Sequence, residues 1–220
     1  MFNILVTGSN GQLGSEIRAL AIGQTNYNFI FTDVEELDIT KHQVVETFIE
    51  FHKINAILNC AAYTAVDKAE SDIELANEIN NLAAENFARI AKEKKIKFIH
   101  ISTDYVFDGV SNVPYKENVN PNPQSVYGKT KLAGEQAILK INPENSIIIR
   151  TSWVYSSFGN NFVKTMLRMS KDRDELNIVA DQIGTPTYAR DLAKIMIEIL
   201  PKVKNKSVEI FHYSNEGVCS

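Results

Sequence analysis

A tyrosine and a lysine four residues apart are the side chains of this sequence best suited to do chemistry together. Tyr127 and Lys131 lie in the run Ser125–Lys131, and on a helix this spacing puts both side chains on one face. A free phenol has a pKa of about 10, and a nearby ammonium favours the phenolate and lowers that pKa toward neutrality. The pair therefore predicts proton transfer by Tyr127, assisted by the charge of Lys131.

A glycine loop near the start of the chain predicts that a nucleotide takes part. Gly8, Gly11 and Gly14 follow an apolar run and precede a helical pattern. In such a loop the first glycine makes the tight turn, the second admits a pyrophosphate and the third lets helix and strand pack closely. A plain glycine-rich turn is the alternative, and the strand–loop–helix context argues against it. We expect the whole loop to contact a dinucleotide, including Asn10, Gln12 and Leu13.

Acidic and small residues after the next two strands extend this prediction. Asp33 follows the glycine loop by roughly 20 residues, where a carboxylate meets the ribose hydroxyls. Because a carboxylate repels a 2′-phosphate, Asp33 favours NADH over NADPH, with a surface turn as the alternative. Asp38 and Ile39 are placed to face the adenine, although Asp38 is equally suited to cap a helix. The turn after the third strand leaves room for a cofactor or simply packs closely; it contains Ala61, Ala62 and Tyr63.

A hydroxyl completes the candidate catalytic group. The fourth apolar run leads into Ile101–Gly109, and its end places Ser102 or Thr103 at the ligand edge of a sheet. There a hydroxyl can donate a hydrogen bond to a substrate carbonyl oxygen. Glycine loop, hydroxyl, tyrosine and lysine in this order form a combination too specific to arise readily by chance.

Short aliphatic runs alternate with longer amphipathic ones, which is the pattern of a parallel sheet covered by helices on both faces. The chain is therefore predicted to be α/β, with a Rossmann-like doubly wound parallel sheet. The expected strands are Asn3–Val6, Phe29–Thr32, Ala56–Asn59, Phe98–Ser102, Ile147–Arg150 and Glu209–Tyr213. The expected helices are Gln12–Ala21, His42–His52, Ile73–Lys94 and Tyr127–Leu139.

The pattern loosens after residue 150, which divides the chain into two expected parts. Residues 1–150 are predicted to form the dinucleotide-binding domain, and residues 151–220 a small, partial substrate-binding region interleaved with the last sheet elements. A loop over residues 108–124, with three prolines, is expected near the site. Ser220 is a residue type that caps the start of a helix, so we expect a truncated chain whose natural form continues.

Composition excludes several other classes of function. A net charge of −4 gives no reason to expect a nucleic-acid partner. No apolar run reaches the roughly 18 residues of a membrane helix, and a strand pattern begins at once, without a signal peptide. Two cysteines, Cys60 and Cys219, form no disulfide framework and suit a reducing cytoplasm. The four histidines lack metal-ligand spacing, so no metal site is expected.

Several stretches resemble the extended short-chain dehydrogenase/reductases, and among these the dTDP-4-dehydrorhamnose reductase family. The stretches are VTGSNGQLG, NCAAYTAVDKAE, STDYVFDG, VYGKTKLAGE, RTSWVY, GNNF and DQIGTPT, and they extend from Val6 to Thr187. The glycine loop and the tyrosine–lysine pair belong to the whole superfamily, whereas AVDKAE, STDYVFDG and TSWVY are typical of the reductases. The resemblance implies that NADPH or NADH reduces the 4-keto group of dTDP-4-dehydro-L-rhamnose.

The resemblance also implies roles for particular residues. Thr103, Tyr127 and Lys131 would form the catalytic group, and Tyr127 and Lys131 would also contact the cofactor. The residues implied near the dTDP-sugar are Tyr105, Trp153, Asn161 and Phe162, and Asn80 would correspond to an asparagine that organises a water near the lysine.

Some relatives bind magnesium at a contact between two subunits, so the resemblance raises the question of a homodimer and of a metal site. Glu16 and Asp191 match the acidic positions of those relatives, but Arg190 stands where they can carry another acid. Surface acids are therefore favoured over a metal site. Relatives also continue past the last residue of this chain, and that remainder helps to close the sugar-nucleotide pocket.

Two alternatives stay open. An epimerase or dehydratase of the same superfamily would also act on a nucleotide sugar, although a dehydratase is expected to carry an acid pair where this chain has Asp104 and Tyr105. A non-catalytic nucleotide-binding subunit, such as the regulatory subunit of methionine adenosyltransferase, also resembles the family. The presence of all three catalytic residues argues against that second alternative.

Overall fold

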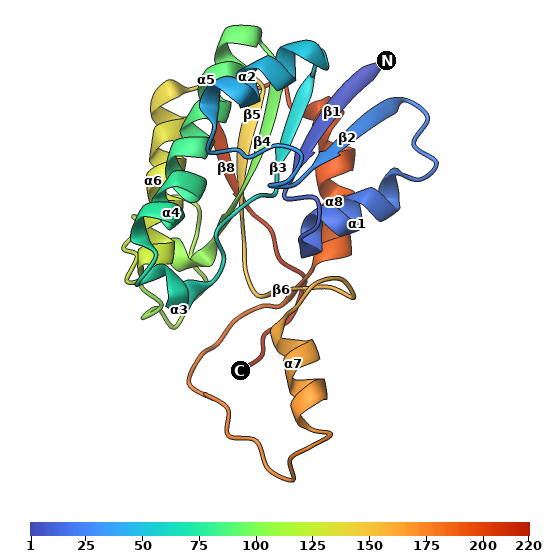
Figure 1. Ribbon diagram of the computed structural model, residues 1–220. Helices are drawn as coiled ribbons and strands as arrows, with labels where there is room; N and C mark the ends of the chain where they lie inside the picture. The colour runs from blue at the N-terminus through green and yellow to red at the C-terminus, as the bar shows by residue number, and fades with distance from the viewer.

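The computed structural model describes residues 1–220, and its centre is a six-stranded sheet in which all strands are parallel (Figure 1). The strand order is β2-β1-β3-β4-β5-β8. The strands are β1 (Phe2–Thr7), β2 (Tyr27–Thr32), β3 (Ala56–Asn59), β4 (Lys97–Thr103), β5 (Ser146–Thr151) and β8 (Glu209–His212). All six predicted strands are confirmed. The central strands carry continuous aliphatic runs because they are buried on both faces of the sheet, whereas the edge strands β2 and β8 are only partly buried.

Helices cover both faces of the sheet, which confirms the doubly wound α/β fold (Figure 1). One face carries α2 (His42–Phe51), α5 (Ala83–Lys94) and α6 (Val126–Ile141), and Phe87 and Phe98 lie in the core beneath them. The other face carries α1 (Gln12–Ala21) and α8 (Ala189–Ile199), which bury Ile17 and Met196 against Ile99. None of these helices combines the length and the apolar character needed to cross a bilayer.

The helix predicted over Ile73–Lys94 is continuous but not regular. It runs as α4 (Ile73–Asn77), a π-helical turn η1 (Glu78–Leu82) and α5, and the short helix α3 (Val66–Ala69) precedes it. Such π-turns occur frequently at functional sites. Here the turn carries the buried Asn80, whose backbone oxygen packs so closely on Gly134 of α6 that a β-carbon at residue 134 would collide with it.

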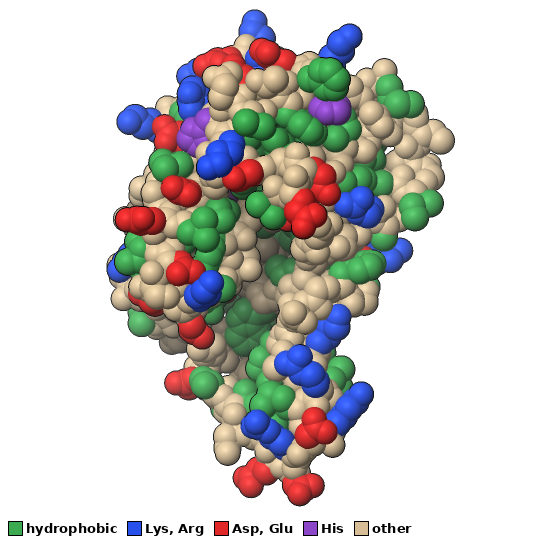
Figure 2. Space-filling view, in the orientation of Figure 1, with side chains coloured by type: hydrophobic (Ala, Val, Ile, Leu, Met, Phe, Trp, Pro, Cys, Tyr) green, Lys and Arg blue, Asp and Glu red, His purple; other side chains and the backbone are tan.

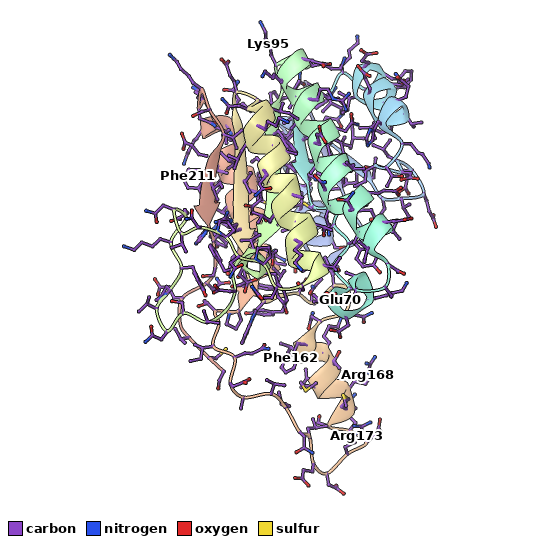
Figure 3. All side chains as sticks on the ribbon, turned by 90° about the vertical axis from the view of Figure 1, so that its left-hand side faces the viewer. Glu70, Lys95, Phe162, Arg168, Arg173 and Phe211 are labelled. Atoms are coloured by element: carbon purple, nitrogen blue, oxygen red, sulfur yellow. The ribbon has the colours of Figure 1, made fainter.

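The last third of the chain leaves the sheet and returns to it. The two-residue strands β6 (Val154–Tyr155) and β7 (Thr187–Tyr188) pair with each other, and α7 (Phe162–Met169) projects beyond the carboxyl ends of the main strands (Figure 1). Figure 3 shows Phe162 at the end of α7 that faces the body, with Arg168 and Arg173 farther out. The short 3-10 turns η2 (Asp104–Val106) and η3 (Leu200–Lys202) complete the elements. The division of the chain at residue 150 stays a prediction.

A buried ion pair fastens α6 to the sheet. Arg150 of β5 donates through Nε to Glu135 Oε1 at 2.9 Å and through Nη2 to Oε2 at 2.7 Å. Both side chains are almost fully buried, and the guanidinium also lies 5.1 Å above the ring of Phe107. Two parallel hydrogen bonds fix direction as well as distance. The pair therefore sets the position of the helix that carries Tyr127 and Lys131.

Replacing Arg150 by methionine is expected to destabilise the fold by about 3–5 kcal/mol, because it leaves the Glu135 carboxylate buried without a partner. Equilibrium unfolding in urea measures this loss. The matched control is Lys68→Met, which breaks the exposed Lys68–Asp72 pair at 3.0 Å and is expected to change stability far less, because water screens an exposed ion pair. Similar, small losses in both variants would show that the buried pair does not anchor α6.

Candidate active site

A cavity of about 1300 Å³ opens at the carboxyl ends of the parallel strands. In the space-filling view it is the hollow between the body of the molecule and the lobe formed by α7 (Figure 2). Its walls come from the glycine loop, the turn after β3, the end of β4, the start of α6 and the base of α7. Ligands of open α/β sheets bind at this edge, where the strand order reverses, and here the reversal lies between β1 and β3.

The glycine loop has the backbone that a dinucleotide pyrophosphate requires. Gly8 has a φ of +63°, and a β-carbon there would collide with the backbone of Ala61 after β3. Gly14 packs in the same way against Gly8 and Ser9. No side chain caps the start of α1 at Gly11, so its free amides and the positive end of the helix face the cavity. These residues fit a bound dinucleotide.

The predicted cofactor residues of the loop divide into two sets. Gly8, Gly11, Gln12 and Leu13 line the cavity, whereas Asn10 and Gly14 do not. Asn10 instead donates its backbone N–H to Asp33 Oδ2 at 2.9 Å, and Gly14 lies in the contact between α1 and the loop. The cofactor contacts expected of these two residues stay predictions.

The acidic residues after β2 lie on the cavity wall. Asp33, Asp38 and Ile39 all line it. Asp33 also accepts the backbone N–H of Val34 at 2.9 Å, so both of its carboxylate oxygens hold the loop. Asp38 accepts from the backbone and the hydroxyl of Thr40, and these hydrogen bonds lower the pKa of its carboxyl group. Asp38 does not cap α2, because the N-cap of that helix is Lys41, three residues beyond Asp38, and the helix begins at His42.

The side chain of Asn80 holds the turn after β3 through hydrogen bonds. Asn80 Oδ1 accepts the backbone N–H of Tyr63 at 2.9 Å, and its Nδ2 donates to the Tyr63 carbonyl at 3.1 Å and to Thr130 of α6 at 3.1 Å. Ala61 and Ala62 line the cavity, whereas Tyr63 does not. The phenol of Tyr63 points away and donates to Asp72 Oδ2 at 2.7 Å.

The three predicted catalytic residues meet on one wall of the cavity. Thr103 ends β4, and Tyr127 and Lys131 lie on the first turns of α6, where Ser125 caps the helix by accepting the Gly128 N–H at 3.1 Å. The Thr103 hydroxyl donates to Asp104 Oδ1 at 3.0 Å. Ser102, the alternative hydroxyl, also lines the cavity, and its buried Oγ has no hydrogen-bond partner.

Burial controls the protonation of this group. Burial raises the pKa of Tyr127 to about 12, against the opposing effect of the Thr103 hydroxyl. Burial also lowers the pKa of Lys131 to about 8, with the Glu135 carboxylate opposing that shift. The prediction of a lowered phenol pKa is therefore wrong for this structure, because loss of water dominates the shift. At neutral pH both groups carry their protons, which is the form that a proton donor requires.

The residues implied near a substrate line the same cavity, with one exception. Tyr105, Trp153 and Phe162 line the cavity, and the Tyr105 ring meets Tyr127 edge to face at 5.4 Å. Asn161 does not line it. Its amide instead donates to Gln12 Oε1 at 2.9 Å and to the Ser156 carbonyl at 2.8 Å, which joins the base of α7 to the start of α1.

Several residues of the wall were not predicted as site residues. Burial raises the pKa of the Cys60 thiol to about 12, so this cavity cysteine is un-ionised at neutral pH. The wall also includes Thr64, Thr151, Asn177, Gln182 and Ser220. No chemical pattern marks these residues in the sequence, although Cys60 follows a strand whose end was expected at the cofactor.

The acids considered for magnesium are engaged elsewhere. Glu16 is buried and accepts the Ser156 hydroxyl at 2.6 Å, with Arg190 Nη1 3.9 Å from its other oxygen. Asp191 accepts from Asn215 Nδ2 at 2.8 Å. No group of three His, Cys, Asp or Glu side chains surrounds a common point that could hold an ion.

Comparison with known proteins agrees with this geometry. The family model described as the RmlD substrate binding domain matches residues 2–220. The dTDP-4-dehydrorhamnose reductase of Aggregatibacter actinomycetemcomitans is 43% identical over all of this chain and 76% of its own length. A crystal structure of such a reductase from Clostridium acetobutylicum has 46% identity and a TM-score of 0.93, over 100% of this chain and 76% of the other.

A second solved structure adds a nucleotide to the comparison. The dTDP-4-dehydrorhamnose reductase of Bacillus anthracis, in complex with NADP, is 40% identical with a TM-score of 0.93, over 100% of this chain and 77% of that one. The match in sequence and fold spans the glycine loop, the catalytic group and the α7 lobe alike. The chain therefore belongs to the RmlD substrate binding domain family, the family of the dTDP-4-dehydrorhamnose reductases.

Proposed function

We propose that this protein reduces the 4-keto group of dTDP-4-dehydro-L-rhamnose to dTDP-L-rhamnose with NADPH or NADH. One observation supports this above the others: a glycine loop fit for a dinucleotide and the group Thr103, Tyr127 and Lys131 share one cavity. The reaction makes a nucleotide-sugar precursor of cell-surface polysaccharides. A cytoplasmic location and a homodimer stay predictions.

The proposed mechanism assigns one task to each catalytic residue. A bound NADPH or NADH supplies the hydride that reduces the carbonyl carbon. Thr103 turns its hydroxyl from Asp104 to the substrate, donates a hydrogen bond to the carbonyl oxygen and stabilises the charge that develops there. Tyr127, which keeps its proton because it is buried, donates that proton to the oxygen. Lys131 holds a positive charge beside the site and orients the nicotinamide ribose.

The aromatic side chains that line the cavity suit the sugar nucleotide. Trp153 and Phe162 expose flat apolar surface toward the cavity, and Tyr105 adds a phenol close to Tyr127. Aromatic side chains of this kind stack on ring systems while their polar atoms fix orientation. We propose that Asn161 serves the substrate indirectly, by holding α7 in place through Gln12 and Ser156.

The assay that tests the function mixes the protein with dTDP-4-dehydro-L-rhamnose and each reduced cofactor in turn. We expect one cofactor to be oxidised for each dTDP-L-rhamnose formed. An epimerase or dehydratase would convert the sugar without net oxidation of the cofactor. A non-catalytic nucleotide-binding subunit would bind the cofactor and leave the sugar unchanged.

Replacing Tyr127 by phenylalanine is expected to lower kcat at least about 100-fold, because it removes the proton donor, while the Kd for NADPH changes little. Steady-state kinetics and calorimetry measure the two quantities. Tyr27→Phe, on the far edge strand β2, is the matched control and is expected to keep full activity. Substantial turnover by the Tyr127→Phe protein would remove this residue from the mechanism.

The pH dependence of kcat/KM is expected to show a fall as pH rises through about 8. The pKa of Lys131 is lowered to about 8, so its charge is present below that pH and lost above it, whereas Tyr127 stays protonated to about pH 12. kcat/KM reports the groups of the free enzyme. In Lys131→Arg, whose guanidinium stays charged, the fall near pH 8 is expected to vanish. If the fall persists in this variant, a group other than Lys131 causes it.

Replacing Asp33 by asparagine is expected to raise the preference for NADPH over NADH on the order of tenfold, because it removes a negative charge from the place of the 2′-phosphate. The ratio of kcat/KM for NADPH to that for NADH measures this preference. A general loosening of the loop would lower both values alike and would leave their ratio unchanged. Glu35→Gln removes an exposed charge two residues away, outside the cavity, and serves as the control. An unchanged ratio in Asp33→Asn would exclude Asp33 from cofactor choice.

A further inference from the structure

A buried row of polar side chains crosses the sheet directly behind the cavity. Thr7, Asn59 and His100 are neighbours in register on β1, β3 and β4, and each is only 1% exposed. Thr7 Oγ1 lies 2.7 Å from Asn59 Oδ1, and Asn59 Nδ2 lies 3.0 Å from His100 Nδ1. His100 Nε2 lies 3.4 Å from Lys131 Nζ. The row therefore ends on the lysine of the catalytic group.

The charge of Lys131 decides where the protons of this row lie. An ammonium has three donors and no acceptor, and Lys131, with a pKa of about 8, is charged at neutral pH. One donor reaches the Ile101 carbonyl oxygen at 2.7 Å, and a second faces His100 Nε2. Nε2 must then accept, so the single proton of a neutral imidazole has to sit on Nδ1.

The surroundings keep the imidazole of His100 neutral. Burial, with the charge of Lys131 as a second cause, holds the pKa of His100 well below its usual value. The other titratable groups that act on Lys131 are Cys60, whose thiol is un-ionised, and Glu135, which is paired with Arg150. A proton added to His100 would place a second positive charge beside Lys131, and neither Cys60 nor Glu135 is free to stabilise that charge.

The proton on Nδ1 needs an acceptor, and Asn59 supplies one when its carboxamide is turned by half a rotation. That turn exchanges nitrogen and oxygen at the same two sites, so that Oδ1 faces His100 and Nδ2 faces Thr7. The Thr7 hydroxyl accepts as readily as it donates. Each of the three contacts of the row then joins a donor to an acceptor with Lys131 charged.

We propose that His100 is a positioning residue for Lys131: its Nε2, held as an acceptor by Asn59 and Thr7, keeps the ammonium charged and leaves its third donor free for the cavity. The importance of that charge for turnover rests on the function proposed above, whereas the hydrogen-bond arrangement does not. Each member of the row directly precedes a cavity residue, namely Gly8, Cys60 and Ile101. The row thus joins the cofactor loop and the catalytic lysine in one buried network.

The tautomer of His100 tests the proposal in the unaltered protein. In a sample labelled with ¹⁵N-histidine, ring nitrogen shifts and couplings identify the protonated nitrogen. We expect His100 to be neutral at pH 7 with its proton on Nδ1. A proton on Nε2, or a doubly protonated ring, would overturn the proposal, because neither form can accept from the ammonium.

Two variants of His100 separate the role of each ring nitrogen. A glutamine amide reaches about as far as Nε2, whereas an asparagine amide reaches only as far as Nδ1. With ¹³C-labelled lysine, the ε-carbon signal of Lys131, identified by its loss in Lys131→Met, titrates with pH. The midpoint is expected to fall by about one pH unit in His100→Asn and to stay near that of the unaltered protein in His100→Gln.

The control is Ile99→Ala, which opens the β4 core on the opposite face of the sheet and is expected to lower stability without moving the Lys131 midpoint. An unchanged midpoint in His100→Asn, or an equal shift in both His100 variants, would contradict the proposal. If the titrations follow expectation and the protein reduces no sugar nucleotide, the proposed function fails and this arrangement stands.

Discussion

The burial of one ammonium group, that of Lys131, is the constraint on which the rest of the site depends. The side chain is 1% exposed between β4 and α6, and burying a charge without compensation costs several kcal/mol. The strand carbonyl of Ile101, the His100 imidazole and the Glu135 carboxylate provide that compensation. All three lie at fixed positions, so the charge is stable only where helix and strand meet in this one arrangement.

The supports of α6 follow from that requirement. Arg150 binds Glu135 through two hydrogen bonds and so holds both the helix and the carboxylate that acts on Lys131. Asn80, on its π-helical turn, ties α6 to the turn after β3. The same contacts place Tyr127 at the cavity wall and bury it, which keeps its proton in place. Stability and protonation at this site therefore have a common origin.

The fold and most of the residues that form the site could be predicted from the sequence, because both depend on local patterns. Continuous aliphatic runs marked the strands, and residues that follow such strands had to meet at one edge of the sheet. Pairings between distant residues left no such signal. The contact between Asn161 and Gln12 joins positions 149 residues apart, and Tyr63 turns toward Asp72 rather than the cavity. The pKa of Tyr127 depends on burial, which the spacing of Tyr127 and Lys131 does not reveal. His100 lies in an apolar strand, which indicates a buried polar contact. Considered only as metal ligands, the histidines do not reveal this contact.

A crystal structure of this protein with NADPH and dTDP bound tests the account most directly. The account predicts that the pyrophosphate of NADPH lies on the amides at the start of α1, just after Gly11, with Lys131 Nζ on the nicotinamide ribose. It further predicts that Tyr127 Oη and Thr103 Oγ1 face one point beside the nicotinamide, each about 3 Å from the place of a carbonyl oxygen. A nicotinamide bound away from these residues, or a Tyr127 hydroxyl turned out of the cavity, would contradict it.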